Sequence, residues 1–504
     1  MSNLKKQFIK NACSGWLAQL SAAIVGFIML PYNLHYLGKE VYGISVLAVS
    51  AIAMLDFLSL GMGPALLRFF SQSIAKNDKE EIGVISSTSQ LILGGLGLLG
   101  GVIILIGIPW FLRFYEIASE HHHETAILLI CLAATFFQKF HTMVFSYIIT
   151  ASHRFDLINF NGIFSSWLRM GLLVLFYKIF TPSLIGLGLA TILANTFNYF
   201  VTIGVSFLLQ GICVCFSLRN VVFSRFPSLF VLSFWTMLNN FCFVVSIQVP
   251  LMIIGKTLSK DMAAYFTPAI LITTYFSSIL GQISVPLTSI ATHDFHKNQG
   301  KKLHILAVSM GQVSSCFGHA CICFLIIFIK DIVFLWLGDG FIWTSSIIIV
   351  MAIGMLYTKI QFVNYSLALG VTTVIPIVCV SIFTAFIVSI VTWFGTVNME
   401  WGLWYVSIGV TLTRILCYTF YPSWAYSKLF SYKFLYYLIQ VYVKPLSTCF
   451  IVLILFIAIQ YFVVLQHVPR IYIAVLGSIL AITLYCFITW FWVLAKETKS
   501  LFLK

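Results

Sequence analysis

Charged residues are scarce in this chain, and acidic residues are the scarcest. The 504 residues include 15 Asp and Glu against 29 Lys and Arg, and 60% of all residues are hydrophobic. A soluble domain carries roughly 25% charged residues, whereas only 9% are charged in this sequence. The composition excludes a water-soluble globular protein and predicts an all-α polytopic membrane protein.

Long polar connections are also missing. The longest connection on the cytoplasmic side, residues 210–227, is too short to hold a soluble catalytic domain. A membrane polymerase or glycosyltransferase would usually show a sizeable outer loop with acidic catalytic residues. The nearest cluster of Glu and His, residues 116–124, has consecutive histidines without the i, i+4 spacing of a zinc pair. The sequence therefore favours a protein that is not an enzyme and that uses no cofactor and no metal.

The sequence also lacks a disulfide framework, a cleavable signal peptide and a basic patch for nucleic acid. The 12 Cys lie in or beside apolar runs, which favours small buried hydrophobes over a disulfide framework. The first apolar run is too long for the core of a cleavable signal peptide and lacks a small-residue cleavage site, so we interpret it as an uncleaved anchor. The positive residues are spread over many short connections instead of one patch, which argues against nucleic acid as a partner.

Fourteen apolar runs are long enough to cross the hydrocarbon core, which takes about 20 residues of helix. They cover residues 11–36, 42–70, 84–112, 126–150, 157–180, 183–209, 228–255, 262–291, 303–329, 344–369, 374–396, 402–425, 446–465 and 470–494. An even number of spans places both termini on one side. Most of the 29 Lys and Arg fall in the connections on the side of the termini, so the positive-inside rule predicts that both termini are cytoplasmic.

A short repeat suggests how the spans are organised. Leu37, Lys39 and Glu40 after the first span recur 221 residues later as Leu258, Lys260 and Asp261 after the seventh. We interpret the repeat as a duplication, which predicts two six-helix bundles related by an axis along the membrane normal. The predicted parts are an N-terminal bundle (1–209), a cytoplasmic linker (210–227), a C-terminal bundle (228–425), and two additional helices with a cytoplasmic tail (426–504).

Five of the apolar runs carry one ionisable side chain near the midpoint, and four of the five are cations. They are Asp56, Lys139, Arg169, Lys359 and Arg414. A charge at this depth costs several kcal/mol unless it faces protein or water, so each is a candidate functional residue. Four buried cations together indicate a pathway for a negatively charged substrate.

Polar residues accompany these cations at helical spacing. Residues three or four apart lie on one face of a helix, and lipid would not tolerate such a polar face. The accompanying residues are Thr135, Gln138, Thr142 and Ser146 for Lys139; Ser165 and Ser166 for Arg169; Ser407, Thr411 and Tyr418 for Arg414; and, less well aligned, Gln361 and Asn364 for Lys359. Span 7 adds a polar stripe that includes Asn239 and Asn240. These faces predict a hydrated cavity for a polar substrate.

Several motifs in order along the chain resemble one transporter family. The chain reads PYNLHYLGKEVYGI at residues 31–44, DFLSLGMGPALLRF at 56–69, SHRFDLIN from 152, IIGKTLSKDMAAYF from 253, VPLTSIATHDFHKNQG from 285 and LWLGDGF from 335. This series is similar to that of the O-antigen and capsule flippases of the multidrug/oligosaccharidyl-lipid/polysaccharide exporter superfamily. Relatives often carry an acidic residue late in span 7, where this chain has Gln248, Val249 and Pro250. The resemblance therefore implies no ion-coupling carboxylate in the half of the chain that begins with span 7.

The resemblance implies a function and a location. Members of the family move undecaprenyl-pyrophosphate-linked oligosaccharide across the bacterial inner membrane by alternating access, without covalent chemistry. It implies as partners the lipid-linked oligosaccharide, membrane lipids and other polysaccharide-assembly membrane proteins. In this interpretation Lys139, Arg169, Lys359 and Arg414 bind the pyrophosphate, and the nearby Asn and Gln side chains bind sugar.

Alternative interpretations stay open. Asp56 either couples transport to an ion or pairs with a cation beside a helix break near Gly61. Arg68, at the inner end of the second span, either gates the pathway or anchors the helix to lipid phosphates. Each buried cation could instead bind another group of the protein and only stabilise the fold. The rival functions are a multidrug antiporter of the same superfamily, which would favour an acidic cavity, and a membrane polysaccharide polymerase or glycosyltransferase.

Overall fold

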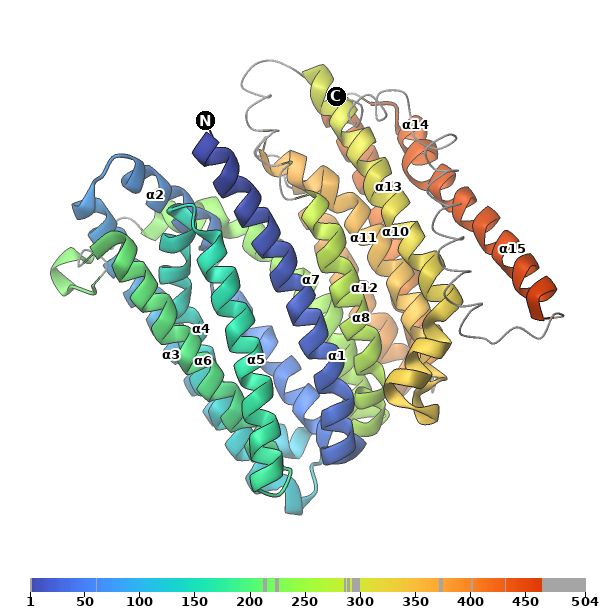
Figure 1. Ribbon diagram of the computed structural model, residues 1–504, viewed down its shortest axis with the longest axis horizontal. Coiled ribbons are helices and arrows are strands. Elements are labelled where there is room, and N and C mark those ends of the chain that lie inside the picture. The colour runs from blue at the N-terminus through green and yellow to red at the C-terminus, as the bar shows by residue number, and fades with distance from the viewer. Residues whose placement is uncertain are drawn as a thin grey trace. The chain divides into compact units, whose positions relative to one another are not determined.

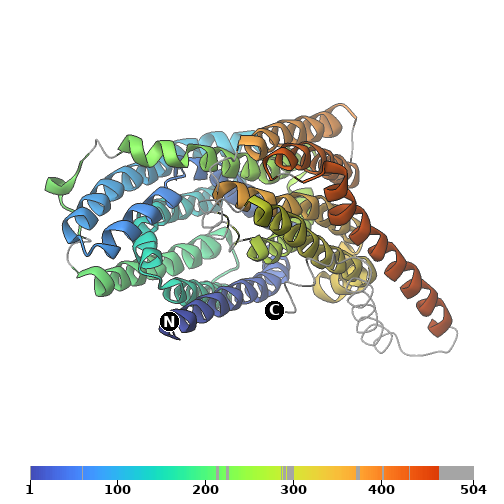
Figure 2. The ribbon, with the colours of Figure 1, turned by 90° about the horizontal axis from the view of Figure 1, so that it is seen from above.

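The computed structural model describes residues 2–59, 61–211, 215–222, 226–284, 287, 291, 300–370, 375–399, 402–430 and 432–464. All regular structure in these residues is helical (Figures 1 and 2). The chain divides into two compact units, Met1–Tyr265 and Phe266–Lys504, and each is described by itself.

The first unit contains the helices up to α7 and the beginning of α8. They are α1 (Ser2–Ala53), the short 3-10 helix η1 (Met54–Ser59), α2 (Gly63–Ala75), α3 (Lys79–Phe114), η2 (Ser119–His121), α4 (His122–Ala151), α5 (Phe155–Ile179), α6 (Leu184–Gln210), η4 (Leu218–Asn220), α7 (Phe226–Thr257) and α8 (Lys260–Ser284). Helix α4 packs between α3 and α6, α5 packs on α1 and α6, and α7 packs on α1, α2 and η1.

One residue divides α1 into two helices. Gly38 has φ 76° and ψ 171°, which is not a helical conformation. Because glycine has no Cβ, it adopts a positive φ without the steric penalty that other residues incur. The chain therefore ends its first helix and begins a second at Gly38 (Figure 1). The first two predicted spans lie within α1 and the elements that follow it.

Small residues on α3 allow its close packing on α4. A Cβ built on Gly97 would lie 2.8 Å from Cβ of Phe140, and one built on Gly100 would lie 2.3 Å from a ring carbon of Phe136. Helices in membranes associate through such small residues because their backbones can then approach closely.

The Asp78 side chain caps the beginning of α3 by accepting a hydrogen bond from the backbone N–H of Glu81 at 3.0 Å.

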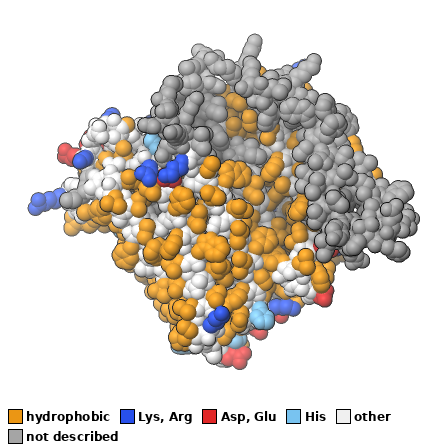
Figure 3. Space-filling view, viewed as in Figure 1, with side chains coloured by type: hydrophobic (Ala, Val, Ile, Leu, Met, Phe, Trp, Pro, Cys, Tyr) orange, Lys and Arg blue, Asp and Glu red, His pale blue; other side chains and the backbone are white. Residues whose placement is uncertain are grey.

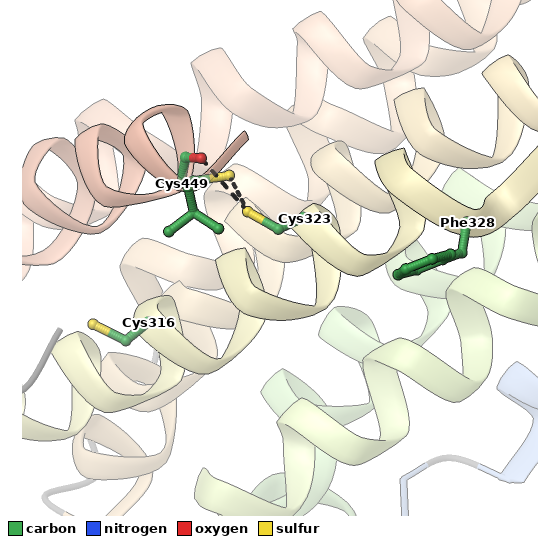
Figure 4. Packing of buried hydrophobic residues seen from close by; sticks show 5 residues of the cluster. Cys316, Cys323, Phe328 and Cys449 are labelled. Carbon is green, nitrogen blue, oxygen red and sulfur yellow. Dashed lines mark hydrogen bonds between the residues drawn. The ribbon is translucent and has the colours of Figure 1, made fainter. Parts of the chain in front are cut away.

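The second unit continues from α8 through seven further helical elements and one 3-10 turn. They are α10 (Gly300–Leu337), η6 (Asp339–Phe341), α11 (Thr344–Gly370), α12 (Ile375–Val397), α13 (Leu403–Leu429), α14 (Phe434–Leu438), the π-helix η7 (Ile439–Val443) and α15 (Lys444–Val464). Helix α11 packs on α10 and α13, α12 packs on α13, and α15 packs on α10. At the last contact, Sγ of Cys323 and Sγ of Cys449 lie 2.8 Å apart in a buried cluster with Cys316 and Phe328 (Figure 4).

The helices confirm that the chain is an all-α polytopic membrane protein. Twelve helical segments of the described residues are long and apolar enough to cross a membrane, and the first of them, Cys13–Ser59, contains the break at Gly38. Thirteen of the fourteen predicted spans thus coincide with helix, and the fourteenth (470–494) lies outside the described residues. The division into two six-helix bundles with two additional helices stays a prediction; in the structure α7 packs within the first unit.

The surface of the first unit fits a membrane environment. On the face in Figure 3, hydrophobic side chains cover the middle, and charged side chains gather towards the upper and lower margins. Large apolar side chains of the first unit are exposed; Ile106 and Leu208, for example, are 75% and 87% exposed. A water-soluble protein rarely exposes such a continuous apolar surface, so this band is the surface that lipid covers.

Candidate functional site

The first unit contains a cavity between η1, α4, α6 and α7. Its volume is about 490 Å³, within the range of roughly 300–1,000 Å³ that small-molecule sites occupy. We call it the first-unit cavity. Its polar lining residues are Asp56, Ser59, Gln138, Lys139, Thr142, Ser146, Tyr147, Asn195, Asn198 and Asn240. Apolar side chains such as Phe57 and Phe241, whose rings meet edge to face, complete the wall.

An ion pair connects two of the predicted site residues in this cavity. Nζ of Lys139 on α4 lies 2.6 Å from Oδ1 of Asp56 in η1. The 3-10 helix and the following Gly61, whose φ is 59°, end the regular helix at this depth and turn Asp56 towards α4. The lysine side chain is 58% exposed and the aspartate 34%, so both remain accessible from the cavity. Among the lining residues that the structure describes, these two are the only Asp, Glu, Lys or Arg, and their formal charges cancel.

Hydrogen bonds from α5 and within α6 orient part of the polar wall. Asn161 on α5 donates to Oδ1 of Asn198 at 2.6 Å, and Asn195 donates to the backbone oxygen of Thr191 at 2.8 Å. Gln138 donates to Oγ1 of Thr196 at 2.8 Å. Side chains held in this way present fixed donors and acceptors, which is the arrangement that recognises hydroxyl-rich ligands.

The second unit brings together two other predicted residues, Gln361 and Asn364 on α11. Both are fully buried. Nδ2 of Asn364 donates to Oε1 of Gln361 at 2.9 Å, and Nε2 of Gln361 donates to Oγ of Ser423 on α13 at 2.6 Å. Each amide also donates to a tyrosine hydroxyl from the segment that follows α13. These two residues lie inside a closed hydrogen-bond network in this structure.

The remaining predicted cations lie in different surroundings. Lys359 on α11 is half-buried, with its ammonium 4.7 Å from the centre of the Phe362 ring, a cation–π contact. Arg414 on α13 is only 2% exposed. Arg169 on α5 and Arg68 on α2 are exposed and do not line the first-unit cavity.

The polar faces predicted for two helices are present, with different surroundings. On α4, the cavity receives Gln138, Lys139, Thr142 and Ser146, as the spacing predicted, but not Thr135. On α13, Ser407, Thr411 and Tyr418 are buried, and the last two bond to neighbouring helices: Thr411 donates to the backbone oxygen of Val350 at 2.9 Å, and the Tyr418 hydroxyl lies 3.1 Å from Oγ of Ser381. On α7, Asn240 lines the cavity beside the buried Asn239.

Sequence reasoning missed Asn195 and Asn198 on α6. They are three residues apart in a helix without charged residues, so their shared face was readable from the sequence. Helix α6 has neither a charge near its midpoint nor a pair of adjacent asparagines, the two patterns that mark the other helices. The tyrosines that bind Gln361 and Asn364 were missed as well, because no local pattern relates them to α11.

A second cluster joins three turns of the first unit. We call it the turn cluster and define it by Glu40, Glu116, Lys256 and Lys260. Lys256 lies 2.6 Å from Oε1 of Glu116, Lys260 donates to the backbone oxygen of Glu116 at 2.9 Å, and Lys260 lies 3.7 Å from Glu40. The hydrogen bond from Lys256 holds the pKa of the exposed Glu116 carboxyl below its ordinary value. By the predicted topology the cluster lies at the outer side of the membrane.

The turns approach each other closely at this cluster. A Cβ built on Gly43 would lie 2.2 Å from the carbonyl oxygen of Lys260, so only glycine permits this contact between the two backbones. The contact joins the region after the first span to the region after the seventh, the same two regions that the repeat relates. Within the described residues, no group of three or more His, Cys, Asp or Glu could hold a metal ion.

Solved structures with the same arrangement of helices exist. The inward-facing conformation of a multidrug resistance MATE family transporter of the MOP superfamily covers 82% of this chain and 98% of its own, with 15% identity and a TM-score of 0.67. The outward-facing conformation of such a transporter covers 85% and 96%, with 16% identity and a TM-score of 0.63. The chain has the MATE fold.

A third structure with the MATE fold differs in its pocket. It is a MOP superfamily transporter from Pyrococcus furiosus, described as having a binding pocket of reverse polarity that suggests a different function; it covers 85% of this chain and 96% of its own, with 16% identity and a TM-score of 0.64. No family model and no curated protein matches the chain. At these identities the likeness shows the fold alone.

Proposed function

We propose that this chain is a flippase that moves undecaprenyl-pyrophosphate-linked oligosaccharide across the bacterial inner membrane by alternating access. Three findings support the proposal: the MATE fold, the flippase-like motifs distributed along the sequence, and the polar first-unit cavity with Lys139 in its wall. The last of these carries it, because it is the property of the molecule that selects a substrate.

The chemistry of the first-unit cavity suits both ends of such a headgroup. A pyrophosphate loses its hydration when it enters a membrane protein, and a lysine ammonium replaces that hydration with charge-assisted hydrogen bonds. Asn195, Asn198, Asn240 and the α4 hydroxyls offer the donors and acceptors that sugar hydroxyls need. The polyprenyl tail is apolar and stays in the bilayer.

The Asp56 carboxylate makes binding an exchange of partners. Lys139 already pairs with Asp56 at 2.6 Å, so an incoming phosphate must displace the carboxylate to reach the ammonium. The displaced Asp56 is then left beside a negative group, where it gains from taking up a proton or a cation. This exchange is the route by which Asp56 would couple transport to an ion.

In this proposal the other predicted residues contact the substrate at other stages of the cycle. In the second unit the substrate would contact Lys359, Arg414, Gln361 and Asn364. In the first unit it would contact Arg169 and Asn239. We assign Arg68 to the gate or to lipid phosphates at the cytoplasmic end, with both termini cytoplasmic.

A multidrug antiporter is the second candidate, and one observation favours it: Asp56 is a carboxylate in the wall of the cavity, where an organic cation could bind. Several solved structures with the MATE fold are described as multidrug resistance transporters. Against it, Lys139 neutralises Asp56, and a cation would have to displace the lysine.

The test is transport by purified protein in vesicles. Undecaprenyl-pyrophosphate-linked oligosaccharide is incorporated with wild type, Lys359→Ala or Arg414→Ala, and the fraction that becomes accessible to an added glycosidase is followed over time. We expect wild type to flip the lipid and both variants to flip it more slowly while inserting normally. Full flipping by both variants would remove Lys359 and Arg414 from the site, and wild-type uptake of an organic cation without flipping would favour the antiporter.

A further inference from the structure

The segment Phe434–Val443, formed by α14 and the π-helix η7, covers the polar face of α11. Two of its tyrosines, Tyr437 and Tyr442, are 0% and 4% exposed. We call this segment the strap. It lies in the second unit, after the helices that the sequence assigned to the two six-helix bundles.

The strap occupies the hydrogen-bonding groups of α11. Nε2 of Gln361 donates to the Tyr442 hydroxyl at 2.7 Å, and Nδ2 of Asn364 donates to the Tyr437 hydroxyl at 3.0 Å. The Tyr442 ring also stacks on Tyr357 of α11, with ring centres 5.4 Å apart. Two amides and an aromatic face thus bind two hydroxyls and a ring. A saccharide offers the same chemistry, with hydroxyls at its rim and an apolar face.

The backbone of the strap is irregular at this point. Residues Ile439–Val443 form a π-helix, a conformation that is rare, occurs mostly as a single turn within α-helices and is frequent at functional sites. Gln440 accepts hydrogen bonds from Nε2 of Gln312 on α10, at 3.0 Å on its side-chain oxygen and 3.3 Å on its backbone oxygen. The widened turn therefore leaves a backbone carbonyl bonded to a side chain of another helix.

A glycine lies at one of the contacts between the strap and α10. A Cβ built on Gly311 would lie 3.2 Å from the Tyr437 hydroxyl and 3.2 Å from Cγ2 of Val441. At this position α10 presents no side chain to the strap, whereas the neighbouring Gln312 is bonded to Gln440 and must release it when the strap leaves.

We propose that the strap is a removable cover on a saccharide-binding site of α11. In the closed state of this structure Tyr437 and Tyr442 fill the site, and during transport the strap lifts and sugar hydroxyls take the places of the tyrosine hydroxyls on Gln361 and Asn364. The exchange replaces the hydrogen bonds that Nε2 of Gln361 and Nδ2 of Asn364 donate to the tyrosines by others of the same kind, so neither donor loses its partner. The proposal rests on the proposed function, since it names the sugar as the ligand.

A disulfide that locks the strap tests this proposal. Gly311→Cys/Val441→Cys places a cysteine on each side of a contact between α10 and the strap, where a Cβ at residue 311 lies 3.2 Å from Cγ2 of Val441, so a disulfide can be engineered across it. The single variants and oxidised wild type are the controls, since wild type contains the adjacent Cys323 and Cys449 (Figure 4). Hydrogen–deuterium exchange of the peptide that contains residues 434–443 reports opening, and flipping of undecaprenyl-pyrophosphate-linked oligosaccharide reports transport.

We expect oxidation of the double variant to slow exchange in the strap and to reduce flipping to the level of protein-free vesicles, with both restored by reductant. Tyr442→Phe, which keeps the ring but removes the hydroxyl, should speed exchange in the strap. Exchange that is equally slow in the reduced and oxidised double variant, or full flipping by the oxidised form, would overturn the proposal. If the strap opens but wild type flips no lipid, the proposed function fails while the opening stands.

Discussion

The exchange of partners at Lys139 gives a measurable signature. Asp56→Asn removes the carboxylate that competes with an anionic substrate and keeps the size of the side chain. The pair is 58% and 34% exposed, so solvent screens it, and pairs of this kind contribute about 0.5–1 kcal/mol. An anion that no longer has to break the pair should bind about two- to fivefold more tightly.

The assay separates binding from turnover. Initial rates of flipping of undecaprenyl-pyrophosphate-linked oligosaccharide are measured in vesicles over a range of lipid densities for wild type, Asp56→Asn and Lys139→Gln. We expect Asp56→Asn to lower the apparent KM by this factor. Its maximal rate should also fall if Asp56 couples transport to an ion. Lys139→Gln should raise the apparent KM, because the headgroup loses its cation.

Opposite results would refute the reasoning. A higher KM in Asp56→Asn would mean that the carboxylate helps to bind the substrate, as in a cation transporter. An unchanged KM in Lys139→Gln would mean that the lysine serves only to neutralise Asp56. The double variant is the matched control, since a formally uncharged cavity without the pair should lose the advantage of Asp56→Asn.

Three further predictions concern stability, measured by thermal unfolding in detergent. Gly43→Ala should destabilise the protein by about 1–3 kcal/mol, because its Cβ would meet the carbonyl oxygen of Lys260. The control Gly95→Ala, which has no atom within 4 Å of its Cβ, should be neutral or stabilising. Equal effects of the two substitutions would disprove the close contact. Asn364→Leu should cost about 1–3 kcal/mol for each buried partner that it leaves unsatisfied, and an unchanged midpoint would show that the network does not stabilise the second unit. Glu116→Gln should lower the unfolding temperature slightly at neutral pH. Since the Glu116 pKa is lowered from 4.5, its stabilisation is present above that value and is lost as the pH falls through the lowered pKa, so a difference between variant and wild type that grows on acidification would contradict this assignment.

The sequence predicted the helices well because each span is a separate apolar run with its own length requirement. The polar face of α4 was predictable for the same reason, since the spacing of Gln138, Lys139 and Thr142 depends only on the geometry of one helix. Which helices meet was not predictable. The pairing of Lys139 with Asp56 depends on the 3-10 helix that follows α1, and the burial of Gln361 depends on the segment that contains Tyr442, 81 residues later. Partners that are distant in sequence leave no local pattern.

The contact at the turn cluster has a consequence for the origin of the molecule. The two regions that meet there are the two copies of the repeat, Lys39 with Glu40 and Lys260 with Asp261. If the repeat reflects duplication, the ancestor was a homodimer in which one turn touched its own copy across a two-fold axis, as isologous interfaces require. Such a dimer would hold two equal ion pairs. In the described residues Lys260 lies 3.7 Å from Glu40, and Lys39 donates to the hydroxyl of Tyr265, one helical turn beyond Asp261. If the duplication holds, these unequal contacts of the two copies arose after their fusion.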